Sequence, residues 1–180
     1  MTYYGGKEMA DAFRTVRGNT VKIAEEIPED KYGFSAAPGT RTVAQMLVHT
    51  ALGPTFQLHV QGNKITDMTA VNFPELFQKI GAEEGKSRTK AEIVAFLKSE
   101  GDRFASFLEG LQESFLAETV AMMPGTGPAR KSRLEMLLSA KEHEMHHRAQ
   151  LMLIERMLDI VPHLTRQFQE RMAAQAASRG

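Results

Sequence analysis

The sequence predicts an all-α fold, a four-helix bundle with a long crossover between the second and third helices. Apolar residues recur at spacings of three and four along four long segments, which is the period of an amphipathic helix. Capping signatures open three of these segments, and no convincing run of alternating β-branched residues appears. We expect a single domain over residues 1–180, with a core at about 5–160 and a C-terminal extension at 161–180.

The first two helices are predicted from periodicity and capping. The first carries one recurring face, and Pro28 ends it. The second begins at "TVAQ", where Thr42 can cap the helix while Gln45 reaches back to it, and runs to about Val60. Gly53-Pro54 falls inside this helix, where the proline removes one backbone hydrogen bond and bends the axis. The face of the first helix comprises Met9, Phe13, Val16, Thr20, Ile23 and Ile27.

A long connection, residues 62–88, separates the second and third helices, with a short helical turn expected at "FPELFQKI". Connections of this length in a compact domain are often functional. The third helix opens at "TKAE" and the fourth, from about Ser132 to Leu158, opens at "SRLE". The C-terminal "LTRQFQERMAAQAASRG" is expected to add a short helix and then fray.

Composition excludes several classes of protein. Lys plus Arg and Asp plus Glu number 22 each, so the net charge is zero, which argues against a general nucleic-acid or membrane-surface role. The short basic run "ARKSR" at 129–133 is the only candidate patch, and a solvated helix start explains it equally well. The absence of cysteine excludes a disulfide scaffold, a thiolate metal site and a cysteine nucleophile. With no signal-peptide pattern and no long apolar run, we expect a cytoplasmic protein.

Histidines are the most informative residues. In "KEHEMHHRAQL", His143 and His147 lie one turn apart within one of two apolar stripes on the fourth helix, while His146 falls between the stripes. His49 shares an apolar stripe on the second helix. Burying three imidazoles without hydrogen-bond partners would cost about several kcal/mol of folding free energy, as it does for other unsatisfied polar groups. One bound cation would satisfy all three rings. We therefore predict a divalent metal site at His49, His143 and His147.

Alternatives to this ligand set stay open. The three rings could instead form a cluster of histidine–histidine hydrogen bonds. His146 could replace His147 as a ligand, since residues three apart on a helix are also neighbours. His59 and His163 are expected to be solvated.

Two glutamates bear on the choice of metal chemistry. Glu144 precedes His147 by three residues, the Glu-x-x-His spacing of di-iron bundles, but the chain supplies no second such pair. Glu100 lies on the apolar face of the third helix, where it could orient a ligand histidine or contact metal-bound water as a catalytic group. An ordinary ion pair between Glu100 and a neighbouring Arg or Lys explains that position equally well.

The chain resembles the DinB-like (DNA-damage-inducible) superfamily, which includes the YfiT-type proteins. The resemblance rests on "TVAQMLVHTA", on "HEMHHRAQL", and on the helix layout over residues 5 to about 160. In that family the solitary histidine and the pair spaced by four hold a divalent metal, usually zinc or nickel. The pattern matches His49, His143 and His147, with Ala149 where the family often has glycine. The resemblance also implies an up-down-down-up bundle and a homodimer, which is common in the family. The second apolar stripe on the fourth helix agrees with a dimer, and the first helix could cover that stripe equally well.

Characterised members of this family use low-molecular-weight thiols such as mycothiol and bacillithiol, so the resemblance implies a small-molecule substrate and no DNA binding. Our first hypothesis is a thiol S-transferase in which bacillithiol, mycothiol or glutathione attacks an electrophile at the metal. The second is a hydrolase that uses metal-activated water, with Glu100 as a general base. The third is a non-catalytic metal- or ligand-binding protein. Arg148, Gln150 and residues 62–88 could shape a substrate pocket, and histidine ligands suit zinc, nickel and copper alike.

Overall fold

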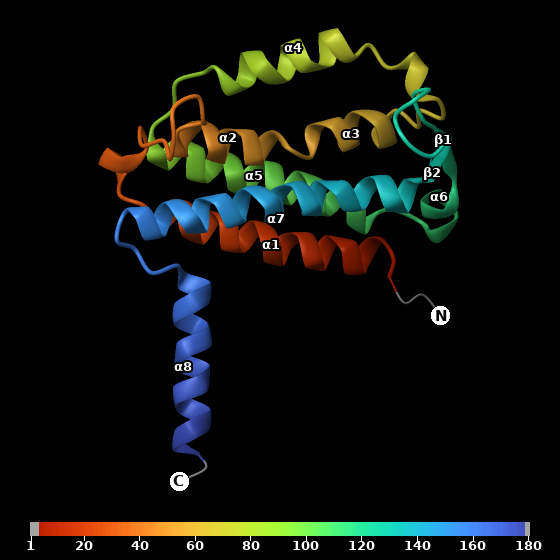
Figure 1. Cartoon of the computed structure of the whole chain (residues 1–180). Coiled ribbons are helices and arrows are strands. Elements are labelled where there is room, and N and C mark those ends of the chain that lie inside the picture. Colours follow the sequence, from red (N-terminus) through yellow and green to blue (C-terminus); the bar gives the residue numbers. More distant parts are fainter. Residues whose placement is uncertain (1–3, 179–180) are drawn as a thin grey trace.

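The computed structural model describes residues 4–178, and its core is a bundle of four long helical rods (Figure 1). The rods are α1 (Gly6–Glu26), the pair α2 and α3 (Val43–Leu52 and Thr55–Gly62), α5 (Lys90–Glu109) and α7 (Arg133–Met157). Helix α1 packs against α5 and α7, and α2 packs against the same two helices from the other side. The predicted all-α four-helix bundle is confirmed.

The chain direction through the bundle is up-down-down-up. In Figure 1, α1 and α7 run one way, whereas the α2–α3 rod and α5 run the other way. Two consecutive parallel rods require a long return, and helix α4 (Phe73–Glu84) makes it along the outside of α2 and α3. The return segment is a twelve-residue helix, longer than the turn expected at "FPELFQKI", and Asn72 caps its start by accepting from the N–H of Glu75.

The expected capping signatures form as hydrogen bonds, with one departure. Reciprocal capping boxes close the starts of α2 and α5, at Thr42–Gln45 and Thr89–Glu92. At the start of α7 only half of the box forms. Ser132 accepts from the N–H of Glu135, but the Glu135 carboxylate pairs with Lys131 instead of reaching back. One capping bond suffices there because further contacts hold this end of α7.

The second predicted helix is wrong as a single bent helix, since Gly53-Pro54 divides it into two. Helix α2 ends at Leu52 and α3 begins at Thr55. The physical reason is the one that predicts a bend: Pro54 has no N–H to donate to the preceding turn, and Gly53 donates to the carbonyl of Thr50 instead of continuing the helix ladder.

A small hairpin closes the far end of the bundle. Strands β1 (Thr119–Ala121) and β2 (Arg130–Ser132) pair antiparallel, just after the short helix α6 (Glu113–Ala117). These strands are not predicted from the sequence, because a strand of three residues is too short to show an alternation of apolar and polar residues.

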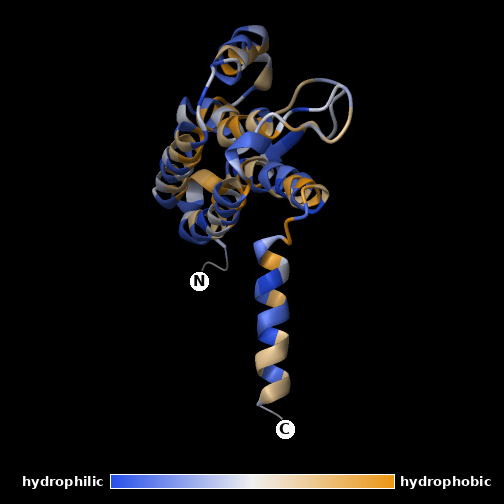
Figure 2. Ribbon diagram, turned by 90° about the vertical axis from the view of Figure 1, so that its left-hand side faces the viewer, coloured by the Kyte–Doolittle hydropathy of each residue, from blue (hydrophilic) through white to orange (hydrophobic). Residues whose placement is uncertain are grey.

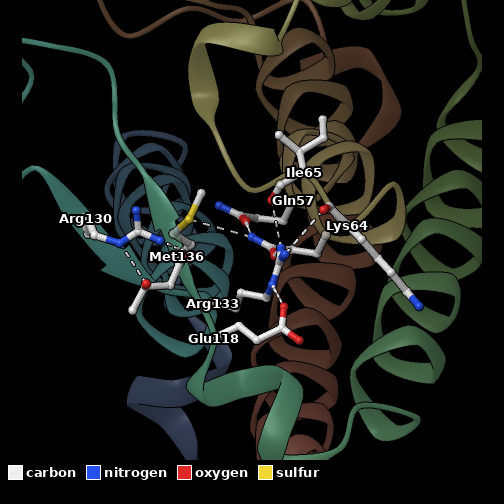
Figure 3. Close-up of polar contacts among 9 residues, drawn as sticks. Gln57, Lys64, Ile65, Glu118, Arg130, Arg133 and Met136 are labelled. Atoms are coloured by element: carbon white, nitrogen blue, oxygen red, sulfur yellow. Dashed lines mark hydrogen bonds and ion pairs between the residues drawn. The ribbon is translucent and has the colours of Figure 1, made fainter.

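Arg133, the first residue of α7, is completely buried and ties this end together (Figure 3). Its guanidinium donates to the carboxylate of Glu118, to the side-chain oxygen of Gln61 and to the carbonyl of Ile65. The basic run at 129–133 is therefore partly structural, since its last arginine joins α7 to the end of α3 and is not available to a nucleic acid.

A buried ion pair crosses the bundle centre. Arg17 of α1 holds both carboxylate oxygens of Glu144 on α7, at 2.7 and 2.9 Å. The same guanidinium donates to the carbonyls of Leu97 on α5 and Thr50 on α2, so one side chain links all four rods. Glu144 is thereby committed to an arginine, which agrees with the rejection of a di-iron site.

Helix α8 (His163–Ala177) projects away from the bundle (Figures 1 and 2). It is longer than the short helix expected. His163, expected to be solvated, is instead 3% exposed, and one of its ring nitrogens lies 3.2 Å from the side-chain oxygen of Asn19. The expectation was wrong because the turn after Pro162 folds the ring back against α1. Among residues 4–178, no helix is long and apolar enough to cross a bilayer.

Candidate metal centre

Three imidazoles from two rods converge on one point in the bundle. The Nε2 atom of His143 lies 3.0 Å from Nε2 of His49 and 3.2 Å from Nε2 of His147. His143 and His147 come from successive turns of α7, and His49 comes from the last turn of α2. The three residues form a group that could hold a metal ion.

The outer nitrogens of two of these rings are held by side chains that fix the ring orientation. Nδ1 of His49 lies 2.5 Å from a carboxylate oxygen of Glu84, and Nδ1 of His147 lies 2.8 Å from the side-chain oxygen of Gln150. A carboxylate only accepts, so Nδ1 of His49 carries the hydrogen, and the same assignment follows for His147. Both Nε2 atoms are then free of hydrogen and direct lone pairs toward the cluster centre.

The third ring is held by close packing. Nδ1 of His143 is buried and has no hydrogen-bond partner among the described residues. A Cβ atom at residue 53 would lie 2.6 Å from this nitrogen, so glycine is needed there to admit the ring. The helix break at Gly53-Pro54 therefore serves the site, because it places a residue without a side chain where His143 approaches α2.

Burial favours the neutral form of two of the rings, those of His143 and His147. Desolvation is the main cause that lowers the pKa of His143 to about 4, with the nearby His147, His49, His146 and Arg41 adding to it. Desolvation also lowers the pKa of His147, and the hydrogen bond that its ring donates to the side-chain oxygen of Gln150 opposes that shift. Neutral imidazole is the form that ligates a metal.

The donor set fits a divalent cation. Ligand atoms placed 2.0–2.1 Å from a tetrahedral cation lie about 3.3 Å from one another, close to the two separations measured between the rings. Without a cation, the three Nε2 atoms have too few hydrogens to form a hydrogen bond at each close nitrogen–nitrogen contact. His143 can place one hydrogen at Nε2 and so satisfy His49 or His147, but not both. The alternative of a purely hydrogen-bonded histidine cluster leaves one close nitrogen–nitrogen contact with no hydrogen between the atoms.

Two cavities of different character meet at the cluster. The first, of about 800 Å³, has mostly polar walls and reaches His147, and we call it the polar cavity. The second, of about 480 Å³, reaches His49 and His143 and has an apolar wall, and we call it the apolar cavity. Arg41, Gly81 and Glu84 line both cavities. The side chains of the polar cavity include Gln45, His146 and Gln150, and those of the apolar wall are Leu52, Phe56, Phe77 and Ile80.

The structure does not bring Glu100 to the histidines. Its carboxylate pairs with Arg103 at 2.7 Å, and it lines a separate hollow between α4 and α5. Glu100 lines neither of the two cavities at the cluster, so the ordinary ion pair explains this residue. His146 stays outside the ligand group, is exposed and lies 3.3 Å from the amide nitrogen of Gln150. His59 also lies outside the group.

Three residues that were not predicted to be part of the site belong to this region: Glu84, Gly53 and Arg41. Glu84 lies in the last turn of α4, within the 62–88 connection whose length suggested a function. Gly53 follows His49 by four residues, which places both on one helical face, and that spacing was a usable signal. Arg41 lies in a loop of ordinary polar composition, where no local pattern marks it.

The up-down-down-up helical bundle and the three histidines on two of its rods define a helical-bundle protein with a candidate metal site. A family model described as the DinB superfamily matches residues 12–151 of this chain. The chain therefore belongs to the DinB superfamily, as the resemblance of its two histidine motifs indicates. No curated protein matches it.

Solved structures share the fold at low sequence identity. YfiT from Bacillus subtilis, described as a probable metal-dependent hydrolase with an unusual four-helix bundle topology, superposes with a TM-score of 0.66 at 13% identity, covering 89% of this chain and 91% of its own. A DinB-like protein from the same organism (YjoA) gives 0.62 at 19% identity, covering 84% and 92%. A DinB-like protein from Bacillus cereus gives 0.64 at 15% identity, covering 86% and 93%.

Proposed function

We propose that this protein is a divalent-metal-dependent enzyme whose ligands are His49, His143 and His147. The observation that carries the proposal is the close approach of three Nε2 atoms that share too few hydrogens to be satisfied by one another. The DinB superfamily membership and the description of YfiT as a probable metal-dependent hydrolase support it. Zinc and nickel are the cations we propose, since both accept imidazole ligands.

We further propose that the reaction is transfer of a low-molecular-weight thiol to an electrophilic substrate. A divalent cation held by three neutral ligands supplies Lewis-acid character, which favours loss of a proton from a thiol or a water molecule. The thiol must come from outside, because the chain has no cysteine. The two cavities support a reaction of two partners, with a polar thiol beside His147 and an electrophile with apolar groups against Phe56 and Phe77.

The residues of the chain have distinct parts in this chemistry. Glu84 and Gln150 accept the Nδ1 hydrogens of His49 and His147, so the ring faces that meet the cation stay unprotonated. The apolar wall keeps water from the electrophile. The thiol releases its proton through the polar cavity, sulfur forms a bond to the electrophilic carbon, and the leaving group departs with the electron pair of the bond that breaks.

Hydrolysis is the second candidate, favoured by the description of YfiT and by the same ligand set. Neither glutamate is free to act as its general base, since Glu100 is paired with Arg103 and Glu84 is held by His49. Hydrolysis would therefore depend on the cation more completely than thiol transfer would.

Metal analysis of the purified protein and of single-histidine variants tests the ligand assignment. We expect about one zinc or nickel per chain, and we expect His49→Ala, His143→Ala and His147→Ala each to lose most of it. His146→Ala is the matched control, since this neighbouring ring lies outside the cluster. Unchanged metal content in His143→Ala would overturn the assignment.

Activity assays separate the functions. Bacillithiol, mycothiol and glutathione are each offered with a panel of electrophiles, and ester and amide substrates are offered without thiol. Thiol-dependent consumption of an electrophile supports the transferase. Turnover that persists without thiol supports the hydrolase, and silence in both assays with metal retained identifies a metal- or ligand-binding protein.

We also propose that the protein acts in the cytoplasm as a homodimer, on small molecules and not on nucleic acids or membranes. The balanced charge supports the exclusion of polyanionic partners. Exposed apolar side chains on neighbouring helices support the dimer, because such a surface is usually covered by a partner. They are Met145, Leu153 and Met157 on α7, and Phe168 and Met172 on α8.

A further inference from the structure

Arg41 is an arginine without a partner at the boundary between the two cavities. It directly precedes Thr42, the cap of α2, and its side chain lines the polar and the apolar cavity. Among residues 4–178, no side chain or carbonyl accepts a hydrogen bond from its guanidinium, and no carboxylate forms an ion pair with it. Of the other described arginines only Arg148 lacks such a bond, and Arg148 lines neither cavity.

The other polar side chains of the polar cavity each have at least one hydrogen-bond partner. Gln150 contacts both His147 and His146, and Gln45 accepts from the N–H of Thr42. Glu84 is the only acidic residue of this wall, and one of its oxygens is held by His49. A ligand entering the polar cavity therefore meets one positively charged side chain, Arg41, whose donors have no partner among the described residues.

The charge balance of the region also favours an anion. Arg41 and Glu84 offset each other, and the three neutral rings leave the full charge of a divalent cation uncompensated. A guanidinium binds a carboxylate through two parallel hydrogen bonds, which are among the stronger contacts in proteins. A single arginine with no second cationic side chain beside it matches a singly charged carboxylate better than a doubly charged phosphate.

We propose that Arg41 binds a carboxylate of the ligand in the polar cavity, so that the site selects carboxylate-bearing small molecules. The inference rests on the proposed function, since it requires the reacting end of the same ligand to lie at the histidines. Applied to the thiols above, it favours bacillithiol and glutathione, which carry carboxylates, over mycothiol, which carries none.

A pair of small thiols that differ only in charge tests this inference. The probes are 3-mercaptopropionate and 3-mercaptopropionamide, with 6-mercaptohexanoate and its amide as a longer pair. Their affinities for the zinc-loaded protein are measured by titration calorimetry, so the readout does not depend on turnover. We expect at least one acid to bind about tenfold or more tightly than its amide, the usual effect of a charge-assisted hydrogen bond.

Substitution of Arg41 identifies the source of the preference. In Arg41→Gln the acid and the amide should bind with nearly equal affinity, while Arg41→Lys should keep part of the difference. Arg130→Gln is the matched control, because this exposed arginine lies in the hairpin and lines neither cavity. Zinc content and the circular dichroism spectrum should be unchanged in all three variants.

Each result has one interpretation. Equal binding of acid and amide to the wild type, or a preference for the acid that survives in Arg41→Gln, would overturn the role of Arg41 and leave the thiol function standing. Failure of every acid and every amide to bind the zinc-loaded protein would overturn the thiol function and this inference together. Loss of zinc on His143→Ala is independent of both outcomes and tests the metal site alone.

Discussion

The imidazole of His143 occupies the space that a side chain on Gly53 would fill. A Cβ atom at residue 53 would lie 2.6 Å from Nδ1 and 3.0 Å from Cε1 of this ring, and 3.3 Å from the carbonyl of Thr50 on its other side. The ring of His143 on α7 thus packs directly against the backbone that follows α2. The position of one metal-site ring depends on the absence of one methyl group.

Gly53→Ala should therefore weaken metal binding without unfolding the protein. The ring of His143 has to move by several tenths of an ångström, which separates its Nε2 atom from those of His49 and His147. We expect metal affinity to fall by about tenfold or more, as for other disturbances of ligand support. Gly18→Ala is the control, since a Cβ there has open space and alanine should stabilise α1 by about 0.5–1 kcal/mol. Wild-type metal affinity in Gly53→Ala would show that the close packing does not matter.

Glu84 should matter for metal affinity although it is not a proposed ligand. Its carboxylate fixes the ring of His49 through Nδ1. Glu84→Ala removes that acceptor, and we expect metal affinity to fall by about 10–100-fold, with a smaller loss in Glu84→Gln. Glu75→Gln on the same helix is the matched control, because Glu75 pairs only with exposed groups. Competition with a chelator measures the effect, and equal affinities for the Glu84 and Glu75 variants would exclude this support role.

Much of the site could be predicted from the sequence, because the spacing of residues along a helix determines which side chains lie side by side. His143 and His147 are four residues apart on a capped helix, so their proximity follows from local geometry alone. His49 could be added because its stripe faces the same core. Glu84 could not be predicted in this way. Its contact with His49 depends on how α4 crosses α2, which no local pattern records.

Glu100 shows the limit of the same reasoning. Its place on an apolar face correctly indicates that it points toward other helices, but the direction alone does not say which ones. The neighbour that it meets is Arg103, one turn away on α5, and both side chains line a hollow shared with residues of α4. Periodicity therefore predicts that this residue is half-buried and does not predict its partner.

The buried pair of Arg17 and Glu144 should be costly to break. Glu144→Ala leaves an uncompensated guanidinium among four helices, and we expect about 3–5 kcal/mol of lost stability in urea unfolding. The exposed contact between Arg14 and Glu109 is the comparison, since Glu109→Gln should cost no more than about 1 kcal/mol. Similar losses in the two variants would contradict a special role for the buried pair.

The proposed dimer can be tested at the exposed apolar residues of α7 and α8. Leu153→Lys and Phe168→Lys place a charge in that surface, and each should shift the protein toward a monomer in light-scattering chromatography. Met123→Lys alters an exposed apolar residue in the hairpin loop and should leave the assembly unchanged. A wild type that is monomeric at all concentrations would refute the dimer.

Glu155 should make the stability of the protein depend on pH. The side chain is completely buried, and neither carboxylate oxygen has a hydrogen-bond partner among the described residues. Burial, with a smaller effect of Glu26, raises the pKa of this carboxyl to about 7, and the charges of Arg166 and Arg156 partly oppose the shift. At pH 4 the group is protonated in the folded and unfolded states alike, so it has no effect on stability there.

Between about pH 4.5 and 7 the unfolded chain loses this proton while the folded protein keeps it, so stability falls as pH rises. Above about pH 7 the folded protein carries the buried charge and the full penalty applies, at most about 3 kcal/mol. Glu155→Gln cannot ionise, so it should match the wild type near pH 4.5 and exceed its stability at pH 8. Unfolding in urea at both pH values measures the difference. Glu142→Gln, an exposed position on the same helix, should show no such gain, and an equal response of the two variants would mean that Glu155 ionises in the folded protein as it does in water.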